Sequence, residues 1–511
     1  MSVWSEGYVA DIDYTASYFG ELNPLRAQLA FLNAGLAFPA VRNAFEMAFG
    51  HGISVNIHAA ASPTRWFGND FAPAQAAYAQ ELAQAAGSNA QLTEESFAEL
   101  LERPDLPAFD FIALHGIWSW VSDTNRTLIV DFIRRKLAPG GVVYVSYNTL
   151  PGWAHIAPMR QLIKEHAHTM RSPGEGTVKR VQGALEFAEQ FLGLPSQYKR
   201  ATPQAAEWLA ELKTKDPVYV AHEYFNDHWK PMYFSDVVRD LAPAKLSFAC
   251  SATLLEQVYP LNLNAEQMAM LAGIGDAHYR ESMLDFIVNQ QFRRDYWVKG
   301  ARRLSAIEQL EAMRRLRLVL LTPAERVPLK VSGRLGTAAL SEAIYRPLLA
   351  ALADHKPKSI GAIEAALAPQ GVDLPKIIQA VVVLTHENHL APAQDDSSIT
   401  ASRKTSDRLN AHLLQLARSN RPITCLASAV TGGGVRVPWH IQLFLLARSK
   451  GLKQPAEWAQ FASEQWTALG HQMVKDGKTI ESAQATLAEL KAMAAGFSEH
   501  GIAPLKALQI V

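Results

Sequence analysis

Short apolar runs alternate with helical patterns through the first 150 residues, and this alternation constrains the fold more than any other feature of the sequence. Four runs have the composition of buried strands, at residues 44–49, 65–70, 109–114 and 142–147, and a short fifth one is expected near 90–92. Helices are predicted between them at 53–61, at 73–86 and from a cap at Ser122 to Leu137. Strands that alternate with helices predict a parallel, doubly wound α/β sheet.

The loop after the first strand carries a chemical signal. Gly50 and Gly52 follow the run at 44–49, and glycines after a buried strand let the backbone approach a ligand closely. Asp70 ends the next strand, roughly twenty residues on, where a carboxylate suits the two hydroxyls of a ribose. Two plainer interpretations stay open here: an ordinary turn at the glycines, and Asp70 as a cap of the following helix.

Length and composition set the broad class. A chain of 511 residues is expected to hold more than one domain. Lys+Arg and Asp+Glu both number 49, so no global basic field favours nucleic acid or a membrane surface. The two cysteines fit a reducing compartment. Neither a signal peptide nor an apolar run of about 20 residues is found, so a cytoplasmic protein is expected.

The remaining chain predicts four further regions after a core at 1–150. Residues 151–215 are helical and charged and are interpreted as an insertion. Residues 216–320 are expected to complete the sheet, with strands at 218–225 and 245–250, and to add linking helices. Residues 321–397 resemble a small winged-helix domain that ends in an apolar β-like run at 380–385, and 398–511 are predicted to be mainly helical, with a turn between helices at 431–434.

Several longer motifs resemble those of class I S-adenosylmethionine-dependent methyltransferases, which have a Rossmann-like fold. The general set comprises the loop Glu46 to Gly52, Asp70, Glu95-Ser96-Phe97, the strand end at His115-Gly116 and residues 137–141. More specifically, residues 115–122, 146–153, 222–226, 289–295 and 431–435 are similar to bacterial methyltransferases that carry a methyltransferase regulatory domain, among them protein-lysine methyltransferases. The resemblance implies S-adenosylmethionine as cofactor, S-adenosylhomocysteine as product, no metal, and a homodimer in some members.

The resemblance also assigns cofactor contacts. Gly50 and Gly52 would admit the methionine part, Asp70 would accept hydrogen bonds from the ribose, and Glu95 with the backbone of Ser96 and Phe97 would meet the adenine. His115, just past its strand, would lie near the sulfonium. The full set of expected cofactor-binding residues is Glu46, Gly50, Gly52, Asp70, Phe71, Glu95, Ser96, Phe97 and His115.

A substrate pocket and a proton acceptor complete the expected site. Aromatic side chains would attract a cationic methyl donor or a lysine by cation–π contact, and the residues expected there are Tyr14, Tyr18, Trp118, Trp120, Tyr147, Asn148 and Trp153. His115, Tyr147 and His222 are the candidate catalytic residues that accept the lysine proton. Core packing of the two tryptophans at 118 and 120, and a purely structural His115, stay open as alternatives. His222-Glu223 lacks the second histidine of a zinc-protease helix.

One departure from the family pattern bears on function. Ala48 and Phe49 stand where relatives usually have a glycine and a small residue, and both would narrow the methionine pocket. The leading hypothesis is a methyltransferase that acts on protein lysine side chains, so a protein is the expected partner and nucleic acid is not. Methylation of a sugar or small metabolite, and a non-catalytic binding or regulatory relative, are the alternatives.

Overall fold

The computed structural model describes residues 7–9, 12, 16–418, 423–475, 478–480 and 482–511. A seven-stranded sheet forms its centre, in the order β3-β2-β1-β4-β5-β7-β6. The strands are β1 Asn43–Met47, β2 Arg65–Asp70, β3 Gln91–Glu94, β4 Phe109–Leu114, β5 Leu137–Asn148, β6 Leu246–Ser251 and β7 Phe292–Lys299. The first five run parallel and β7 is antiparallel to β5 and β6. This confirms the predicted Rossmann-like α/β fold, and the strand order reverses at β1, where such sheets bind ligands.

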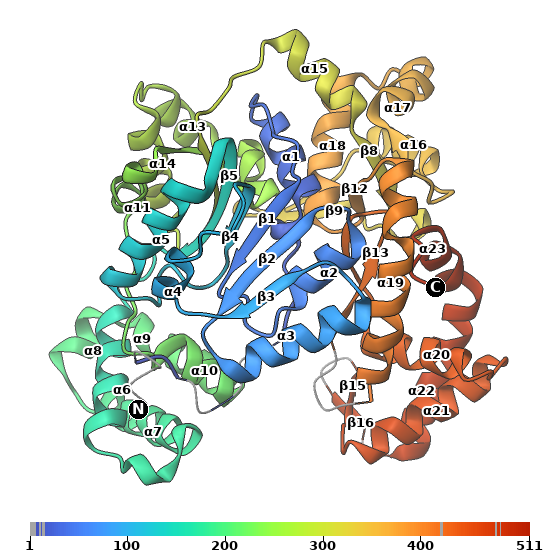
Figure 1. Ribbon diagram of the computed structural model, residues 1–511. Helices are drawn as coiled ribbons and strands as arrows, with labels where there is room; N and C mark the ends of the chain where they lie inside the picture. The colour runs from blue at the N-terminus through green and yellow to red at the C-terminus, as the bar shows by residue number, and fades with distance from the viewer. Residues whose placement is uncertain (1–6, 10–11, 13–15, 419–422, 476–477, 481) are drawn as a thin grey trace.

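Helices cover both faces of the sheet (Figure 1). Helices α1 (Pro24–Asn33), α2 (Ile53–Ala61) and α3 (Pro73–Ala86) cover one face, and α4 (Phe97–Leu101), α5 (Asp123–Lys136) and α11 (Phe234–Leu241) cover the other. The Ser122 hydroxyl accepts a hydrogen bond from the N–H of Asn125 and so caps α5, as predicted. The predicted ranges 53–61, 73–86 and 109–114 agree with the structure to the residue.

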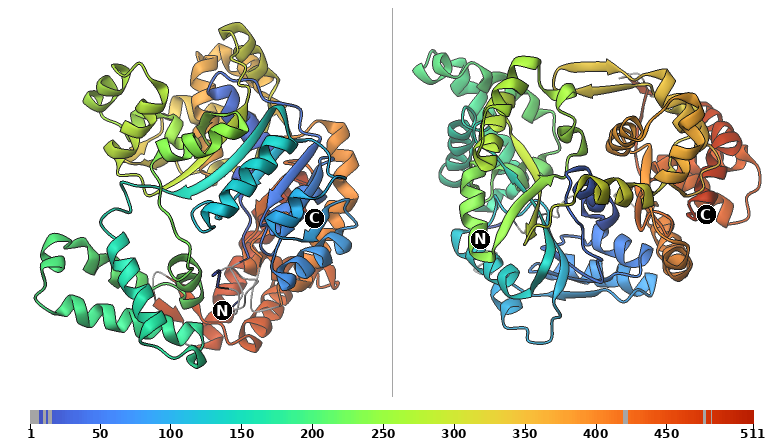
Figure 2. Two further views of the ribbon diagram at one scale, coloured as in Figure 1. Left: turned by 60° about the vertical axis from the view of Figure 1, so that its left-hand side comes forward. Right: turned by 90° about the horizontal axis from the view of Figure 1, so that it is seen from above.

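A helical insertion leaves the sheet after β5 and returns before β6. It consists of α6 (Ala157–Thr169), α7 (Thr177–Gly193), α8 (Gln197–Ala201), α9 (Gln204–Lys213) and α10 (Pro217–Tyr224), and it buries a core of its own. Figure 2 shows it projecting from the rest of the molecule. The predicted strand at 218–225 is wrong, because Asp216 caps a helix with Pro217 in its first turn and Val220, Ala221 and Tyr224 bury one helical face.

Helices α12 (Tyr259–Asn262), α13 (Ala265–Ala272) and α14 (Ala277–Val288) lead from β6 to β7. Strand β7 was not among the predicted strands, because only linking helices were expected after the strand at 245–250. Arg293, Arg294 and Asp295 interrupt the apolar pattern at the start of this strand. The sequence therefore lacks the apolar run or the apolar–polar alternation that predicts a strand.

A smaller unit follows, with the four helices α15 to α18 and a three-stranded antiparallel sheet in the order β11-β8-β12. Its elements are α15 Ala306–Arg315, β8 Arg317–Leu320, β9 Lys330–Gly333, β10 Gly336–Ala339, α16 Glu342–Ala351, β11 Lys358–Ser359, α17 Ile360–Leu367, α18 Leu374–His386 and β12 Leu390–Ala393. The β-like run expected at 380–385 lies inside α18, because a short continuous apolar stretch does not distinguish a buried strand from a buried helix.

The carboxyl-terminal region packs against α2 and α3 (Figure 1). It comprises α19 Asp396–Leu416, β13 Cys425–Ser428, β14 Gly433–Arg436, α20 Trp439–Ser449, α21 Pro455–Ala468, β15 Met473–Lys475, β16 Lys478–Ile480, α22 Ala483–Gly496 and α23 Ile502–Ala507. The turn at 431–434 connects the two strands of the β13–β14 hairpin, not two helices as expected. Among the described residues, no helix is both long and apolar enough to cross a membrane.

Candidate active site

The loop between β1 and α2 places backbone N–H groups at the switch point of the sheet. Gly50 and Gly52 have φ angles of 60° and 66°, a region that glycine enters without steric cost. Ala48 has a φ of 48° and therefore carries local strain. A Cβ on Gly52 would approach the Ala79 Cβ to 2.5 Å, so this glycine allows α2 and α3 to pack closely. A Cβ on Gly50 would meet nothing within 4 Å.

Asp70 joins this loop to the end of β2. One carboxylate oxygen accepts a hydrogen bond from the N–H of Gly50 at 2.8 Å, and the other accepts one from Ala72 at 2.9 Å. Asp70 does not cap α3, because the N-cap residue of that helix is Ala72 and the helix has no side-chain cap hydrogen bond. Each Asp70 oxygen keeps a second acceptor position for a ligand. Burial raises the pKa of Asp70 to about 7, against the effect of the two hydrogen bonds.

Glu46 on β1 is a second buried carboxyl group beside the loop. Its side chain is 4% exposed, and its Oε2 has no hydrogen-bond partner in the described structure. Burial raises the pKa of Glu46 to about 8. A buried polar atom without a partner carries a desolvation cost that a hydrogen-bonding ligand would remove.

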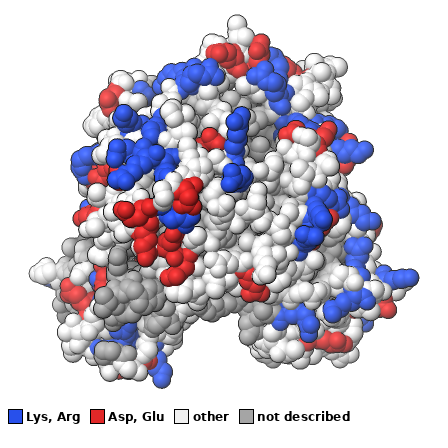
Figure 3. All heavy atoms as spheres, in the orientation of Figure 1, with Lys and Arg blue, Asp and Glu red and all other residues white. Residues whose placement is uncertain are grey.

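These residues line a cavity of about 630 Å³, a size suited to a nucleoside cofactor. It is bounded by the loop 48–51, the ends of β2, β3 and β4, the starts of α4 and α5, and the end of α10. Six carboxylic residues line it, whereas no Lys or Arg of the described chain does; the six are Glu46, Asp70, Glu94, Glu95, Glu99 and Glu223. Figure 3 shows acidic side chains gathered over α4.

The turn before α4 also lines the cavity with Glu95, Ser96 and Phe97, the residues expected to meet the adenine. The Glu95 carboxylate is held by Arg103 at 3.0 Å and by the Thr93 hydroxyl at 2.6 Å. Ser96 caps α4 through Glu99. The polar side chains are thus engaged locally, which leaves backbone groups and the Phe97 ring as the natural contacts for a flat base.

His115 lies at the end of β4 and faces the cavity. Its ring stacks on Phe19 with centroids 3.5 Å apart, and its Nδ1 lies 2.9 Å from the Tyr144 hydroxyl. Burial lowers the pKa of His115 to about 4, so the ring is neutral at pH 7. The N–H of Gly116 donates to the Ser146 hydroxyl, which fixes the turn that presents the histidine.

The opposite wall comes from the insertion and the amino-terminal segment. His222, Glu223, Asn226 and His228 line the cavity together with Tyr8, Trp120 and Phe71. The Asn226 side chain accepts a hydrogen bond from the N–H of Val9 at 2.8 Å, and the His222 Nε2 donates to the Ile12 carbonyl at 3.1 Å. The Trp120 indole N–H donates to the carbonyl of Glu223.

Five residues expected in the substrate pocket lie elsewhere. Trp118 is fully buried in the sheet core, and the Tyr147 hydroxyl donates to Asp295 at 2.7 Å from the same core. Burial holds the pKa of Tyr147 well above its usual range. Tyr18 contacts His58 and the β13–β14 hairpin, Trp153 packs on Trp229, and the backbone of Asn148 pairs with Ser119 and Met232. Tyr14 lies outside the described residues.

Other residues line the cavity without having been expected in the site: Phe19, Glu94, Glu99, Asn226 and His228. Asn226 ends the motif at 222–226, but no site role was assigned to it. Two of them follow α10 in the chain, where a strand was expected, so that segment could not be placed at the cavity. No group of three or more His, Cys, Asp or Glu in the described chain could hold a metal ion.

The residues present fit S-adenosylmethionine. The unpartnered Glu46 oxygen, the Asp70 carboxyl group and the open space at Gly50 face one cavity at the switch point. Phe49 does not fill it: its ring lies against Gly68, where an added Cβ would come within 2.8 Å of the Phe49 Cδ1. The missing side chain of Gly68 makes room for the ring.

Comparisons with known proteins agree with this geometry. Residues 45–145 match the family model described as a methyltransferase domain, and residues 216–299 match the one described as a predicted methyltransferase regulatory domain. The fold resembles the structure of PKMT2 from Rickettsia typhi in complex with AdoHcy, with a TM-score of 0.67 and 17% identity over 97% of this chain and 99% of that one. The sheet, the cavity and these matches define a class I S-adenosylmethionine-dependent methyltransferase.

Relatives extend over the whole chain. The protein is 36% identical over 500 residues to the uncharacterized protein sll1526 of Synechocystis sp., covering 97% of each chain. It is 24% identical over 288 residues to the uncharacterized protein RP789 of Rickettsia prowazekii, covering 55% of this chain and 51% of the relative. The chain belongs to the same family as sll1526, and it combines a match to the methyltransferase domain with a match to the regulatory domain.

Proposed function

We propose that this methyltransferase modifies a cationic amine, and that the amine is a lysine side chain of a protein. The observation that carries the proposal is the cavity lining, which includes six carboxylic residues and no Lys or Arg of the described chain. Carboxylates attract a positively charged methyl donor and an ammonium-bearing substrate, and they repel phosphates and carboxylates. PKMT2 of Rickettsia typhi, which shares the fold, has a name consistent with this substrate class.

The cofactor residues follow from the contacts described above. Asp70 would bind the ribose hydroxyls, the backbone at Gly50 and the Glu46 carboxyl would bind the methionine part, and Phe71, Phe97 and the backbone at 95–97 would enclose the adenine. Gly52 acts indirectly, through helix packing. When bound, S-adenosylmethionine supplies a methyl group on a positively charged sulfur, so the protein mainly binds, orients and excludes water.

The wall opposite the cofactor residues would receive the substrate amine. A protonated lysine cannot attack a methyl group, so its proton must first leave. His222 lines the cavity, and because the Ile12 carbonyl only accepts, the Nε2 atom of the His222 ring carries the proton of that hydrogen bond. We propose His222 as the proton acceptor and neutral His115 as a wall of the reaction space. Tyr147 is excluded from this role by its hydrogen bond to Asp295 in the core.

An uncharged sugar or small metabolite would not require the excess of carboxylates around the cavity. The non-catalytic alternative depended on a blocked methionine pocket, and the ring of Phe49 leaves the cavity open. A homodimer and the division into five domains, with boundaries at 150, 215, 320 and 397, stay predictions.

Calorimetric titration with S-adenosylhomocysteine tests the cofactor site. Replacing Asp70→Ala removes the ribose acceptor and is expected to weaken binding about 100-fold, since charge-assisted hydrogen bonds contribute about 1.5–3 kcal/mol each. Asp131→Ala is the matched control, because Asp131 forms surface ion pairs on α5 with Arg134 and Arg135.

Transfer of labelled methyl groups then tests the substrate class. Lysine-rich proteins are expected to accept the label, and chemical blocking of their lysines is expected to abolish it. Label transfer to glycans, with none to proteins, would contradict the lysine proposal while leaving the cofactor site intact.

A further inference from the structure

The insertion is joined to the sheet by two chain crossings that lie side by side. The segment leaving β5 and the segment returning before α11 pair through hydrogen bonds from Leu150 N–H to the Met232 carbonyl and from Met232 N–H to the Asn148 carbonyl, at 3.0 Å each. The end of α10 and the segment after it carry His222, Glu223 and Asn226 to the cavity, and they belong to the insertion that these two crossings join to the sheet. We call the paired crossings the base of the insertion. The position of this base therefore helps to set the position of the cavity wall that the insertion forms.

The turn before β7 clamps the base. The N–H of Thr149 donates to the Gln291 carbonyl at 2.8 Å, and the N–H of Gly152 donates to the Gln290 carbonyl at 3.0 Å. A Cβ on Gly152 would lie 2.3 Å from that Gln290 oxygen, so the contact is as close as the backbone allows. The backbone at Gln290 and Gln291 thus helps to position the first residues of the insertion.

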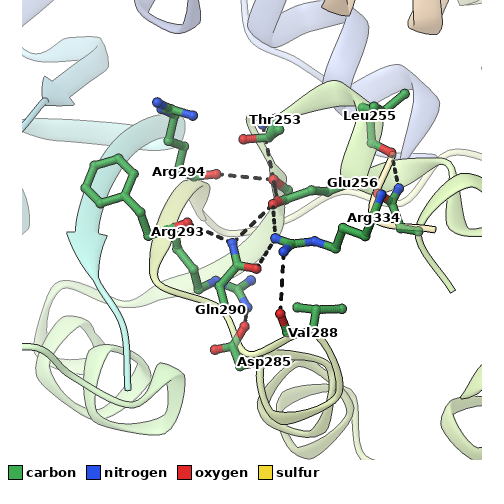
Figure 4. Close-up of polar contacts among 12 residues, drawn as sticks. Thr253, Leu255, Glu256, Asp285, Val288, Gln290, Arg293, Arg294 and Arg334 are labelled. Atoms are coloured by element: carbon green, nitrogen blue, oxygen red, sulfur yellow. Dashed lines mark hydrogen bonds and ion pairs between the residues drawn. The ribbon is translucent and has the colours of Figure 1, made fainter. Parts of the chain in front are cut away.

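Gln290 is itself held through its buried side chain (Figure 4). Its amide nitrogen donates to the Phe292 carbonyl at 2.7 Å and to Glu256 at 3.1 Å, and its amide oxygen accepts a hydrogen bond from Arg334. Arg334 also contacts Glu256 at 3.3 Å and the Val288 carbonyl at 3.5 Å. Arg334 is the one described residue that donates to the Gln290 amide oxygen.

Arg334 arrives from a distant part of the chain. It lies at the tip of the β9–β10 hairpin, beyond the regulatory domain that matches at 216–299. The tip is seated on the segment around α12: the N–H of Arg334 donates to the Asn262 side chain at 3.3 Å, and a Cβ on Gly333 would lie 2.1 Å from the Leu261 carbonyl. The hairpin therefore delivers its guanidinium to Gln290 in a defined position.

We infer that Arg334 is a positioning residue for the substrate wall of the active cavity, acting through Gln290 and the Gly152 turn on the insertion. The inference rests on the proposed function, because it takes the α10 end as the wall that receives the substrate. It separates the two halves of the cavity: the hairpin sets the substrate wall, while the residues around Asp70 hold the cofactor independently of it.

The experiment compares Arg334→Met, Arg334→Lys and Lys330→Ala. Lys330 lies on the same hairpin with an exposed side chain, so its replacement is the matched control. For Arg334→Met we expect the KM for a lysine-bearing protein to rise about tenfold, with kcat and the affinity for S-adenosylhomocysteine changed less than twofold. Arg334→Lys is expected to recover part of the KM, and Lys330→Ala to match the parent.

Hydrogen exchange provides a readout that needs no methyl transfer. In Arg334→Met the amides of Thr149 and Gly152 and those of α10 are expected to exchange at least fivefold faster, while those of α2 keep their rates. Unchanged exchange at Thr149 and Gly152 would overturn the inference whatever the substrate proves to be. Faster exchange there with no methylation of any lysine would instead sustain it and count against the proposed function.

Discussion

The two walls of the active cavity are supported in opposite ways. The cofactor wall, formed by β1, α2 and the end of β2, is embedded on all sides, and every residue of α2 is buried. Val55 and Ala59 face the sheet, while Ile53, Ile57, Ala60 and Ala61 pack into the core of the carboxyl-terminal region. Most helices that flank a sheet bury one stripe; α5 does so and exposes Asp123, Thr127, Arg134 and Arg135 to solvent.

Polar contacts reinforce the same contrast. The last carbonyl groups of α2 accept hydrogen bonds from the carboxyl-terminal region: Ala60 from Thr405 and Ser406, and Ala61 from Gln394. These are groups that a helix leaves unpaired by itself. The substrate wall, in contrast, belongs to an insertion with its own core and a narrow base. The difference teaches that the cofactor end of the cavity is embedded in two cores, whereas the substrate end is supported separately by the insertion.

The largest effect is expected from breaking the embedded wall. Ile57→Ala removes a buried side chain that packs into the carboxyl-terminal core and is expected to cost about 2–5 kcal/mol of unfolding free energy. Thr127→Ala at an exposed position of α5 is expected to stay within about 0.5 kcal/mol. Denaturant unfolding measures both.

The same denaturant unfolding experiment tests whether the cofactor domain and the carboxyl-terminal region unfold as one cooperative unit. With a shared core, Ile57→Ala is expected to lower the stability of the cofactor domain and the carboxyl-terminal region together, and to weaken S-adenosylhomocysteine binding. A carboxyl-terminal transition that keeps its parental midpoint in the variant would contradict the contrast between the walls.

Sequence reasoning was most accurate for the cofactor wall and least accurate for its supports. The strand at 109–114 and the helices at 53–61 and 73–86 could be predicted because strong periodicity and local caps specify them. The loop and Asp70 could be brought to one place from the sequence because local spacing sets their positions, and both line the cavity; their contacts with the cofactor stay a prediction. The apolar composition of α2 on both faces is the one signal that a second layer would cover it.

The substrate wall could not be predicted in the same way. The end of α10 reaches the cavity through tertiary packing. Its aromatic and β-branched residues predict a strand, because such residues are enriched in strands, but they also pack well on the buried face of a helix. Trp118, Tyr147 and Trp153 had the right chemistry for a substrate pocket, but the pleat of the sheet and the packing of the insertion direct them into cores. Which face a side chain takes depends on register, which composition does not encode.

A smaller effect is expected from pH, and it belongs to the cofactor wall. Burial raises the pKa of Glu46 to about 8 and that of Asp70 to about 7, so both are largely protonated in the free protein at pH 6. The ligand's ammonium and ribose hydroxyls favour the ionised carboxylates. Affinity for S-adenosylhomocysteine is therefore expected to rise roughly tenfold from pH 6 to pH 8, with protons released on binding.

Stability of the free protein is expected to change in the opposite direction. Carboxyl groups whose folded pKa lies above the unfolded value stabilise the fold at low pH, and that stabilisation is lost as pH rises toward 7 and 8. Glu46→Gln is expected to flatten both dependences. Calorimetry in buffers of different ionisation enthalpy counts the protons, and an affinity that is flat between pH 6 and pH 8 would contradict the assignment.

The smallest expected effect sharpens the comparison through two alanines of the same wall. Ala48 adopts a φ of 48°, a conformation that costs an L-residue about 1 kcal/mol or more, and Ala59 lies inside α2. Ala48→Gly is expected to relieve strain and raise the unfolding free energy by about 0.5 kcal/mol after the greater unfolded-state entropy of glycine is offset. Ala59→Gly is expected to lower the unfolding free energy by about 1 kcal/mol or more, because glycine has a lower helix propensity and the buried methyl group is lost.

Because Ala48 lines the cavity, Ala48→Gly is also expected to bind S-adenosylhomocysteine at least as tightly as the parent. Opposite signs for the same exchange at two positions eleven residues apart would show that the embedded wall holds a strained loop in place, whereas equal losses at both positions would mean that the loop is relaxed.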